Sequence, residues 1–139
     1  MTTEEKQLLL QVISANLTHG LKAFFVDVDT GMPTQCKILG VKTNELVEII
    51  RIDTNGKEFG RSEWMDVSFF NPYLRPISSM TEEEKTWATA SYEYNKLTHG
   101  MDYAITAYVD YLYSIHIDCH DLIPKGLAIP APEGKYDLK

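Results

Sequence analysis

Asn71-Pro-Tyr-Leu-Arg-Pro-Ile-Ser-Ser-Met-Thr-Glu-Glu-Glu84 is the segment that decides the fold, because it separates a β-patterned half of the chain from a helical half. Pro72 and Pro76 lack a backbone N–H and bias the preceding residue towards an extended conformation, so regular strand pairing is expected to stop here. Thr81 and Glu84 have the spacing of a capping box, in which a hydroxyl and a carboxylate each accept a backbone N–H at a helix start. The segment therefore predicts a crossing from sheet to helix over residues 71–80.

The helical half, residues 81–139, is predicted to begin with two helices on either side of Gly100, a natural helix stop. The first helix should run from Thr81 to about Leu97, and two sets of its residues compete for the inward face. One set is Trp87, Ser91, Tyr94 and Leu97, and the other is Ala88 and Tyr92. The second helix, over residues 101–116, has an apolar stripe at helical spacing made by Met101, Ala104, Ile105, Tyr108, Tyr111, Leu112 and Ile115. The short connection predicts an antiparallel helix pair.

The first half, residues 1–70, is predicted to open with a helix over residues 3–17, capped by Thr3, and to continue as four strands. The strands are expected over residues 21–28, 35–41, 45–52 and 57–67. Asn55-Gly56, between the last two strands, favours a type I′ turn, which needs positive φ at both central residues. Short sequential strands of this kind predict an antiparallel sheet with one face covered by the N-terminal helix.

The fold class predicted from these patterns is α+β, in one domain over residues 1–139. It combines an N-terminal helix, a small four-stranded antiparallel sheet and a C-terminal antiparallel helix pair. Curling of the sheet into an SH3-like barrel stays open, since the number of strands does not distinguish a barrel from an open sheet. A chain of 139 residues is within the usual size of one domain.

Composition limits the class of protein and its surroundings. The chain is 44% hydrophobic and 24% charged, which is typical of a folded globular protein. Its formal net charge is −7 and neither half carries a basic stripe, which argues against nucleic acid as a partner. No apolar run approaches the roughly 20 residues of a membrane helix, and the N-terminus lacks the layout of a signal peptide. We expect a cytoplasmic protein without a membrane partner, in which Cys36 and Cys119 stay reduced.

One cluster near the C-terminus has the residue types of a metal site. His116 and His120 are four residues apart and would share a helix face, with Asp118 between them, so a metal-dependent hydrolase is one interpretation. Two imidazoles do not complete a ligand set, however, and histidines near a helix C-terminus are explained by the exposed carbonyls there. The chain also lacks a recognisable nucleophile motif and a Gly-rich phosphate loop. The sequence therefore predicts no catalytic residue and no cofactor.

Tyrosines are the side chains that point to a partner. Most of them fall in the helix pair, and the predicted apolar stripe leaves Tyr103 and Tyr113 exposed. Exposed tyrosines are enriched at protein interfaces. Tyr73 and Arg75 are assigned to the same role, because the crossing from sheet to helix does not explain them. These four residues predict contact with another protein or self-association.

Two segments carry a resemblance to other proteins. Tyr73-Leu-Arg-Pro-Ile-Ser-Ser-Met-Thr-Glu-Glu-Glu84, followed by His116-Ile-Asp118, Leu122-Ile123, Lys125-Gly-Leu-Ala128 and Ala131-Pro-Glu-Gly134, resembles small uncharacterised proteins of prophages and mobile elements of gut bacteria. The resemblance implies an origin and no activity. His120 departs from the group, which has a different polar residue there, and this weakens the metal interpretation.

The function predicted from the sequence is that of a non-enzymatic accessory protein of a phage or mobile element, acting by protein–protein binding. Two alternatives stay open. One is a nucleic-acid-binding module with an SH3-like fold, and the other is the hydrolase built on His116, Asp118 and His120.

Overall fold

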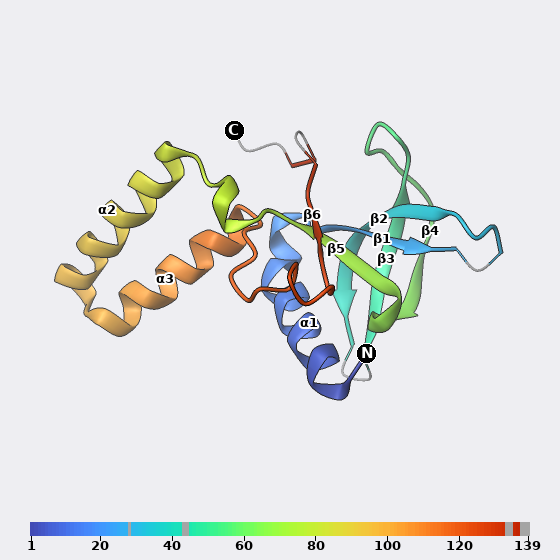
Figure 1. The fold of residues 1–139 in the computed structure, drawn as a ribbon, viewed down its shortest axis with the longest axis horizontal. Helices are drawn as coiled ribbons and strands as arrows, with labels where there is room; N and C mark the ends of the chain where they lie inside the picture. The colour runs from blue at the N-terminus through green and yellow to red at the C-terminus, as the bar shows by residue number, and fades with distance from the viewer. Residues whose placement is uncertain (28, 43–44, 133–134, 137–139) are drawn as a thin grey trace.

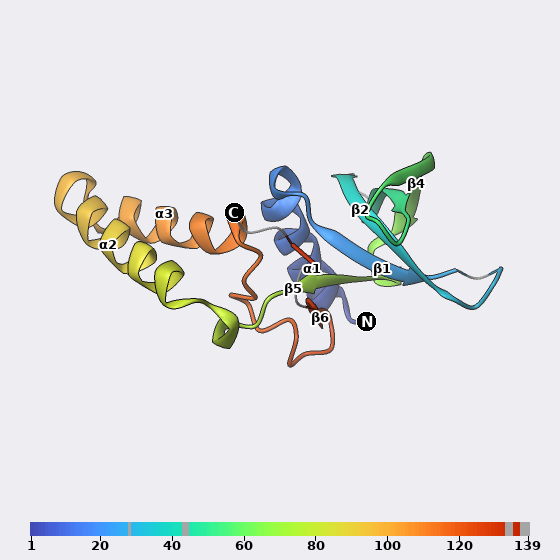
Figure 2. The ribbon, with the colours of Figure 1, turned by 90° about the horizontal axis from the view of Figure 1, so that it is seen from above.

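The protein has two parts, a body of one helix and a sheet, and a helical hairpin that projects from it (Figure 1). The computed structural model describes residues 1–139 except 28, 43–44, 133–134 and 137–139. Seen from above, the hairpin again lies to one side of the body, beyond the first helix (Figure 2). The predicted α+β class, with an N-terminal helix and two C-terminal helices, is confirmed.

Helix α1, Thr3–Asn16, begins with a capping box one residue earlier than predicted. Thr2, not Thr3, is the N-cap: its Oγ1 accepts the Glu5 N–H at 3.1 Å, and the Glu5 carboxylate accepts the Thr2 N–H at 2.9 Å. Leu9, Val12 and Ile13 are buried at helical spacing. This face packs on the sheet, and a one-turn 3₁₀ helix, Leu17–His19, then leads into the first strand.

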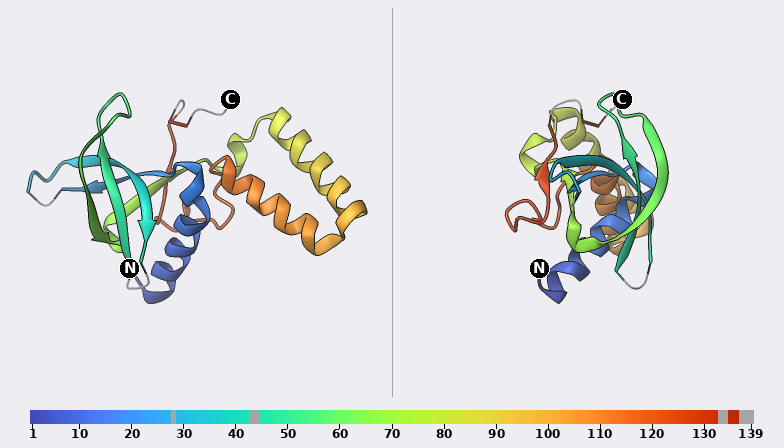
Figure 3. Two further views of the ribbon diagram at one scale, coloured as in Figure 1. Left: turned by 180° about the vertical axis from the view of Figure 1, so that it is seen from behind. Right: turned by 90° about the vertical axis from the view of Figure 1, so that its right-hand side faces the viewer.

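The sheet has six strands in mixed orientation, so the prediction of four antiparallel strands is wrong. The strands are β1 (Lys22–Val26), β2 (Pro33–Val41), β3 (Leu46–Ile52), β4 (Glu58–Asp66), β5 (Phe70–Leu74) and β6 (Ile129–Pro130). Their order is β4-β3-β2-β1-β5-β6, and the β5–β6 pair is parallel while the other pairs are antiparallel. The four predicted strands correspond to β1–β4. Among the described residues the outer strands β4 and β6 do not pair, so the sheet is twisted but open (Figure 3).

The two additional strands come from segments rich in proline. Pro72 lies in β5 and is paired with Ala23 of β1, although its missing N–H is expected to stop pairing. In an antiparallel ladder only every second N–H points at a given neighbour, so a proline fits where no donor is required. Short 3₁₀ turns, Val67–Phe69 and Ile77–Ser79, precede and follow this strand.

The turn between β3 and β4 differs from the predicted type I′ turn. Gly56 has a positive φ of 79°, but Asn55 does not belong to the non-glycine residues with positive φ. The Asp53 carbonyl accepts the Gly56 N–H at 2.9 Å, and Asp53 N–H donates to the Lys57 carbonyl at 2.9 Å. The loop is therefore one residue longer than the two-residue form, with glycine alone in the left-handed conformation.

The main core lies between α1 and the sheet. It joins Leu9 and Ile13 of α1 to Phe25 of β1, Ile49 of β3 and Phe70 of β5. Leu122, Leu127 and Ala128, which follow the hairpin, complete it. Within the described part of the chain, neither helix of the hairpin contributes a residue to this buried cluster.

The hairpin consists of α2 (Glu82–His99) and α3 (Met101–Ser114), as predicted, joined through Gly100. The capping box of Thr81 and Glu84 is confirmed, with the Glu84 N–H donating to Thr81 Oγ1 at 3.1 Å and the Thr81 N–H to Glu84 Oε1 at 2.9 Å. Gly100 has a φ of 94°, which a residue with a side chain rarely adopts. None of the helices in the described ranges is both long and apolar enough to span a membrane.

Candidate functional site

Arg75 lies at the joint between the body and the hairpin, and is held by its backbone and its side chain. Its N–H donates to the His116 carbonyl at 2.7 Å, and its carbonyl accepts the Asp118 N–H at 2.8 Å. Its guanidinium donates to both carboxylate oxygens of Glu84, at 2.8 and 2.7 Å, and to the Ser79 carbonyl at 3.0 Å. The hydrogen bonds from Arg75 hold the pKa of Glu84 at about 2. The end of β5 is thus fastened to the start of α2.

The sequence predicts that Tyr73 and Arg75 contact a partner, and the burial of both residues corrects this prediction. Tyr73 is 9% exposed and Arg75 8% exposed, so little of either side chain is accessible to another molecule. The crossing from sheet to helix does explain both residues, because β5 continues through Tyr73 and Arg75 supplies the ion pair.

The expectation that Tyr113 is exposed is also wrong. Its side chain is 8% exposed, and its hydroxyl shares a hydrogen bond of 2.6 Å with His120 Nε2. Burial raises the pKa of Tyr113 to about 12. Helix α3 contacts α1 of the body, and an apolar stripe drawn for two isolated helices does not include this contact.

His116, Asp118 and His120 are each engaged separately. The His116 ring is 4% exposed and stacks on Tyr136 with a centroid distance of 3.7 Å. Both Asp118 oxygens accept backbone N–H groups, from Leu122 and Ile123, at 2.8 Å each. In the ranges that the structure describes, no group of three His, Cys, Asp or Glu side chains is placed to hold a metal ion. These contacts hold the segment after α3 in place. They do not form the ligand set that the hydrolase interpretation requires.

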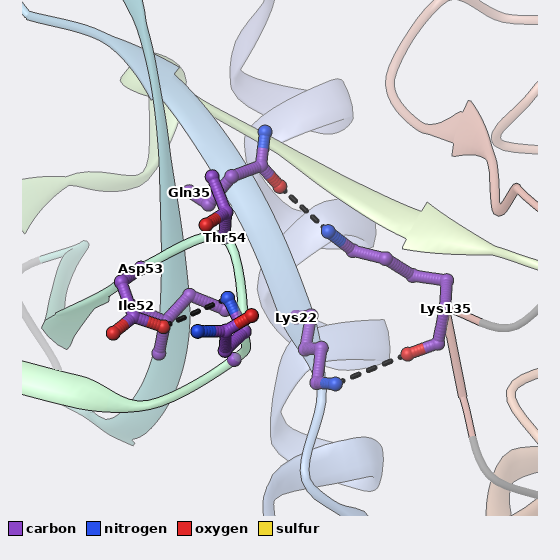
Figure 4. A pocket seen from close by; sticks show the side chains of 8 residues that line it. Lys22, Gln35, Ile52, Asp53, Thr54 and Lys135 are labelled. Carbon is purple, nitrogen blue, oxygen red and sulfur yellow. Dashed lines mark hydrogen bonds between the residues drawn. The ribbon is translucent and has the colours of Figure 1, made fainter.

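A small pocket near the C-terminus contains two lysines (Figure 4). Lys135 Nζ donates to Gln35 Oε1 at 2.7 Å, and Lys22 Nζ donates to the Lys135 carbonyl at 3.0 Å. Asp53 also lines the pocket, and its carboxylate accepts the N–H groups of Asn55 and Lys57. Burial and the neighbouring Lys22 lower the pKa of Lys135. The two lysines attach the C-terminal segment to β1 and β2, since both ammonium groups already have protein acceptors.

A second hollow, of about 300 Å³, lies near the turn after β1 and contains Arg51. The guanidinium donates to Asp27 at 2.9 Å and to Glu63 at 2.8 Å. The two carboxylates neutralise this arginine. Their hydrogen bonds, those with Glu63 most of all, also raise the pKa of Arg51 above its usual value. A phosphate or carboxylate ligand would have to compete with both acids.

The hairpin carries several large apolar side chains that are exposed. Trp87 is 62% exposed, Tyr94 65% and Leu97 86%, and the small Ala90 lies between them in sequence and is also exposed. We call Trp87, Ala90, Tyr94 and Leu97 the α2 stripe. The sequence offered two inward faces for α2, and the structure buries Ala88, half-buries Tyr92, and leaves Trp87 and Tyr94 outside.

The opposite flank of the hairpin is apolar as well. Thr89, Tyr92, Ile105 and Tyr108 line an open hollow of about 300 Å³. Tyr92 and Tyr108 meet edge to face across the two helices, at a centroid distance of 6.2 Å. Tyr103, near the tip of the hairpin, is 51% exposed and stacks on His99 at 4.3 Å. Of the four residues predicted for partner contact, Tyr103 is the one that lies on the surface.

Comparison with known proteins found no relative: no family model, no curated protein and no solved structure matches the chain. The candidate site is therefore defined by the geometry of this chain alone. It is the α2–α3 hairpin, because large apolar side chains, Trp87, Tyr94 and Leu97 among them, gather there on the surface.

Proposed function

We propose that this protein is a non-enzymatic accessory protein of a phage or mobile element, and that it works by binding another protein through the α2–α3 hairpin. The observation that carries the proposal is the exposure of Trp87, Tyr94 and Leu97, each more than 60%, on a hairpin outside the main core. Contiguous exposed apolar surface of this kind is typical of interaction sites. The origin in a phage or mobile element rests on the resemblance of residues 73–84 and 116–134.

The energetics of helix packing support this proposal. A helix pair that leaves apolar side chains on both flanks is an incomplete layer, since stable folds bury such faces against a further element. Tryptophan and tyrosine are also the residues that most often dominate binding energy, because they combine a large area with few rotatable bonds. A partner that covers Trp87 and Tyr94 would therefore gain hydrophobic stabilisation that the body of this chain does not supply.

The rigid attachment of the hairpin supports the same proposal. The ion pair between Arg75 and Glu84 and the capping box at Thr81 fix the start of α2 in the free protein. Tyr113 and His120 fix the end of α3. A surface that is already ordered loses less conformational entropy on binding, and this favours affinity.

The experiment compares capture by the wild-type protein and by a variant with Trp87→Ser and Tyr94→Ser. Each protein is immobilised and exposed to a lysate of host bacteria, and the retained proteins are quantified by mass spectrometry. Thr106→Ser, at an exposed position of α3 outside the α2 stripe and the hollow, is the matched control. We expect a retained protein that the wild type and the control share and the double variant loses. That protein is then purified and its affinity is measured directly.

An identical set of retained proteins for the wild type and both variants overturns the proposal. Circular dichroism of each variant shows beforehand that the hairpin is folded. The chain itself, carrying a second tag, is added to the lysate so that self-association is measured in the same assay.

A further inference from the structure

We infer that the partner of the α2 stripe is a second copy of this chain, packed with its α2 helix antiparallel so that two hairpins form a four-helix bundle. The inference rests on the proposed function, because it names the occupant of the same surface. Four features of α2 point to this occupant and this orientation: spacing, size, charge and area.

The spacing of the stripe is that of a helix that packs along another helix. Trp87, Ala90, Tyr94 and Leu97 are separated by three, four and three residues, which is the a/d repeat of a helix–helix seam. The stripe extends over most of α2, a helix of 18 residues. Toward α3 the helix uses a different line, through Ala88, Ser91 and Asn95, each at least half-buried. The exposed repeat is thus additional to the seam within the hairpin.

The sizes of the four side chains favour an antiparallel pair. In a parallel pair related by a two-fold axis, each residue meets its own copy, so Ala90 would face Ala90 and leave a gap between two tryptophans and two tyrosines. In the antiparallel pair, an axis between Ala90 and Tyr94 sets the small Ala90 against Tyr94 of the second copy. It also sets Trp87 against the second copy's Leu97. Large residues then fill the space beside small ones, as close packing requires.

Charge favours the same orientation. The first turn of α2 holds Glu82, Glu83 and Glu84, and the last turn holds Lys96 and His99. Glu82 pairs with Lys85 and Glu84 with Arg75, which leaves Glu83 without an ion pair among the described residues. An antiparallel neighbour sets this acidic first turn beside the C-terminal end of the second copy's α2, whose last turn carries Lys96 and His99 and no carboxylate. A parallel neighbour would bring two acidic turns together.

The area available is sufficient for a specific interface. Large aromatic side chains carry roughly 150–250 Å² each, so the stripe offers on the order of 500 Å² per chain at the observed exposures. Two copies would remove about 1,000 Å² from water, which is the threshold for a biological interface. Pairing two equivalent patches around a two-fold axis is also the commonest symmetry of soluble oligomers.

The first test is the oligomeric state of the full chain by sedimentation equilibrium. The wild type is expected to be a dimer at a concentration of about 100 μM. Leu97→Glu places a carboxylate in the seam and should weaken dimerisation by at least about 100-fold. Thr106→Glu adds the same charge at an exposed position of α3, outside the α2 stripe and the hollow, and should leave the dimer intact. Circular dichroism confirms that each variant is folded before it is compared.

The second test determines orientation by exchanging the sizes of two facing side chains. Ala90→Tyr and Tyr94→Ala are each expected to weaken the dimer several-fold, because in the antiparallel pair the first sets two tyrosines against each other and the second sets two alanines against each other. The double variant, with both changes, restores one tyrosine against one alanine and should return towards the wild-type affinity in an antiparallel pair. A double variant no tighter than the weaker single variant overturns the antiparallel arrangement.

The failure of this inference is distinguishable from the failure of the proposed function. A wild-type chain that stays monomeric at about 100 μM, while the stripe variants still lose a different captured protein, overturns self-association and leaves partner binding in place. A dimer that Leu97→Glu does not weaken overturns the inference, since the two chains then meet elsewhere. A monomer that captures no protein through the stripe overturns both.

Discussion

The guanidinium of Arg75 and the carboxylate of Glu84 form a two-point ion pair, with N–O distances of 2.8 and 2.7 Å, that joins the last residues of the sheet to the first turn of α2. Both side chains are almost buried, at 9% and 13% exposure. Glu84 also accepts the Thr81 N–H in the capping box, so one carboxylate starts the helix and anchors it to the body. The direction in which the hairpin projects is set here, because the pair fixes two elements at one point.

Arg75→Ala should destabilise the protein by about 3 kcal/mol, because it leaves the buried Glu84 carboxylate without its cation. Arg75→Lys should also be destabilising, since an ammonium cannot reproduce the two parallel bonds and the bond to the Ser79 carbonyl. Urea unfolding monitored by circular dichroism measures both. Arg61→Ala, an exposed arginine on β4, is the control and should change stability by less than about 0.5 kcal/mol. Equal values for Arg75→Ala and Arg61→Ala would contradict the role of the pair.

Stability should fall as the pH is lowered from 6.5 to 4, because burial lowers the pKa of His116 from 6.5 to about 4. The unfolded chain binds a proton in that window and the folded chain does not, so acid favours unfolding, by on the order of 3 kcal/mol. His116 has a φ of 62°, a conformation that asparagine tolerates. His116→Asn should therefore lose this part of the pH dependence, as followed by urea unfolding at several pH values.

His99→Asn, an exposed histidine at the end of α2, is the control for that measurement and should keep the wild-type profile between pH 6.5 and 4. A second loss should appear below pH 4.5 in all three proteins. The Glu84 pKa is lowered from 4.5 to about 2 by its hydrogen bonds with Arg75, so this stabilisation is present above 4.5 and disappears as the carboxylate is protonated.

Tyr136→Phe should cost about 1–2 kcal/mol, because the phenol hydroxyl links three places in the chain. It accepts the Lys22 N–H at 3.0 Å and donates to the Tyr73 carbonyl at 2.7 Å. The ring remains in the variant, so its stacking on His116 is kept and the loss reports the hydroxyl alone. Tyr108→Phe is the matched control for thermal unfolding, because the hydroxyl of Tyr108 has no hydrogen-bond partner among the described residues. A loss that is the same in both variants would mean that the hydroxyl of Tyr136 does not hold the C-terminal segment.

Tyr113→Ala and Tyr103→Ala should separate a core tyrosine from a surface one. Tyr113 is almost buried, so its truncation should destabilise the protein by about 3 kcal/mol or more. Tyr103 is half exposed near the tip of the hairpin, and its truncation should change stability by less than about 0.5 kcal/mol. Denaturant midpoints measure the difference. The reverse order would show that α3 meets the body through another face.

Local sequence patterns predict the structure correctly where neighbouring residues decide it. Thr81 and Glu84 interact across three residues, so their capping box was visible in the sequence and begins α2 as expected. Gly100 ends that helix for a reason that belongs to its own backbone. The β1–β4 strands were found from their composition, although the turn at Asn55 and Gly56 took a longer form.

Local patterns do not predict contacts between residues far apart in the sequence, and the candidate site shows the reason. Strand β5 pairs with β1, and β6 pairs with β5, so segments far apart in the sequence are joined. The prolines within residues 71–80 do not indicate these pairings. Tyr73 and Arg75 looked unexplained because their partners, Tyr136 and Glu84 among them, are assigned only by the folded chain. Two faces of α2 were compatible with the same periodicity.

The sequence by itself determined the three helices, with their ends to within about two residues, and the strands β1–β4, since these depend on residues within one or two turns. The tertiary structure decided what those segments face. It buried Arg75 and Tyr113, and it left Trp87, Tyr94 and Leu97 uncovered. The physical reason is that burial depends on which other surface is present, and a 3.6-residue period shows only that a helix has an apolar face. The same segment that divides the chain, residues 71–84, is therefore the anchor of the hairpin, and the surface for a partner lies beyond it on α2.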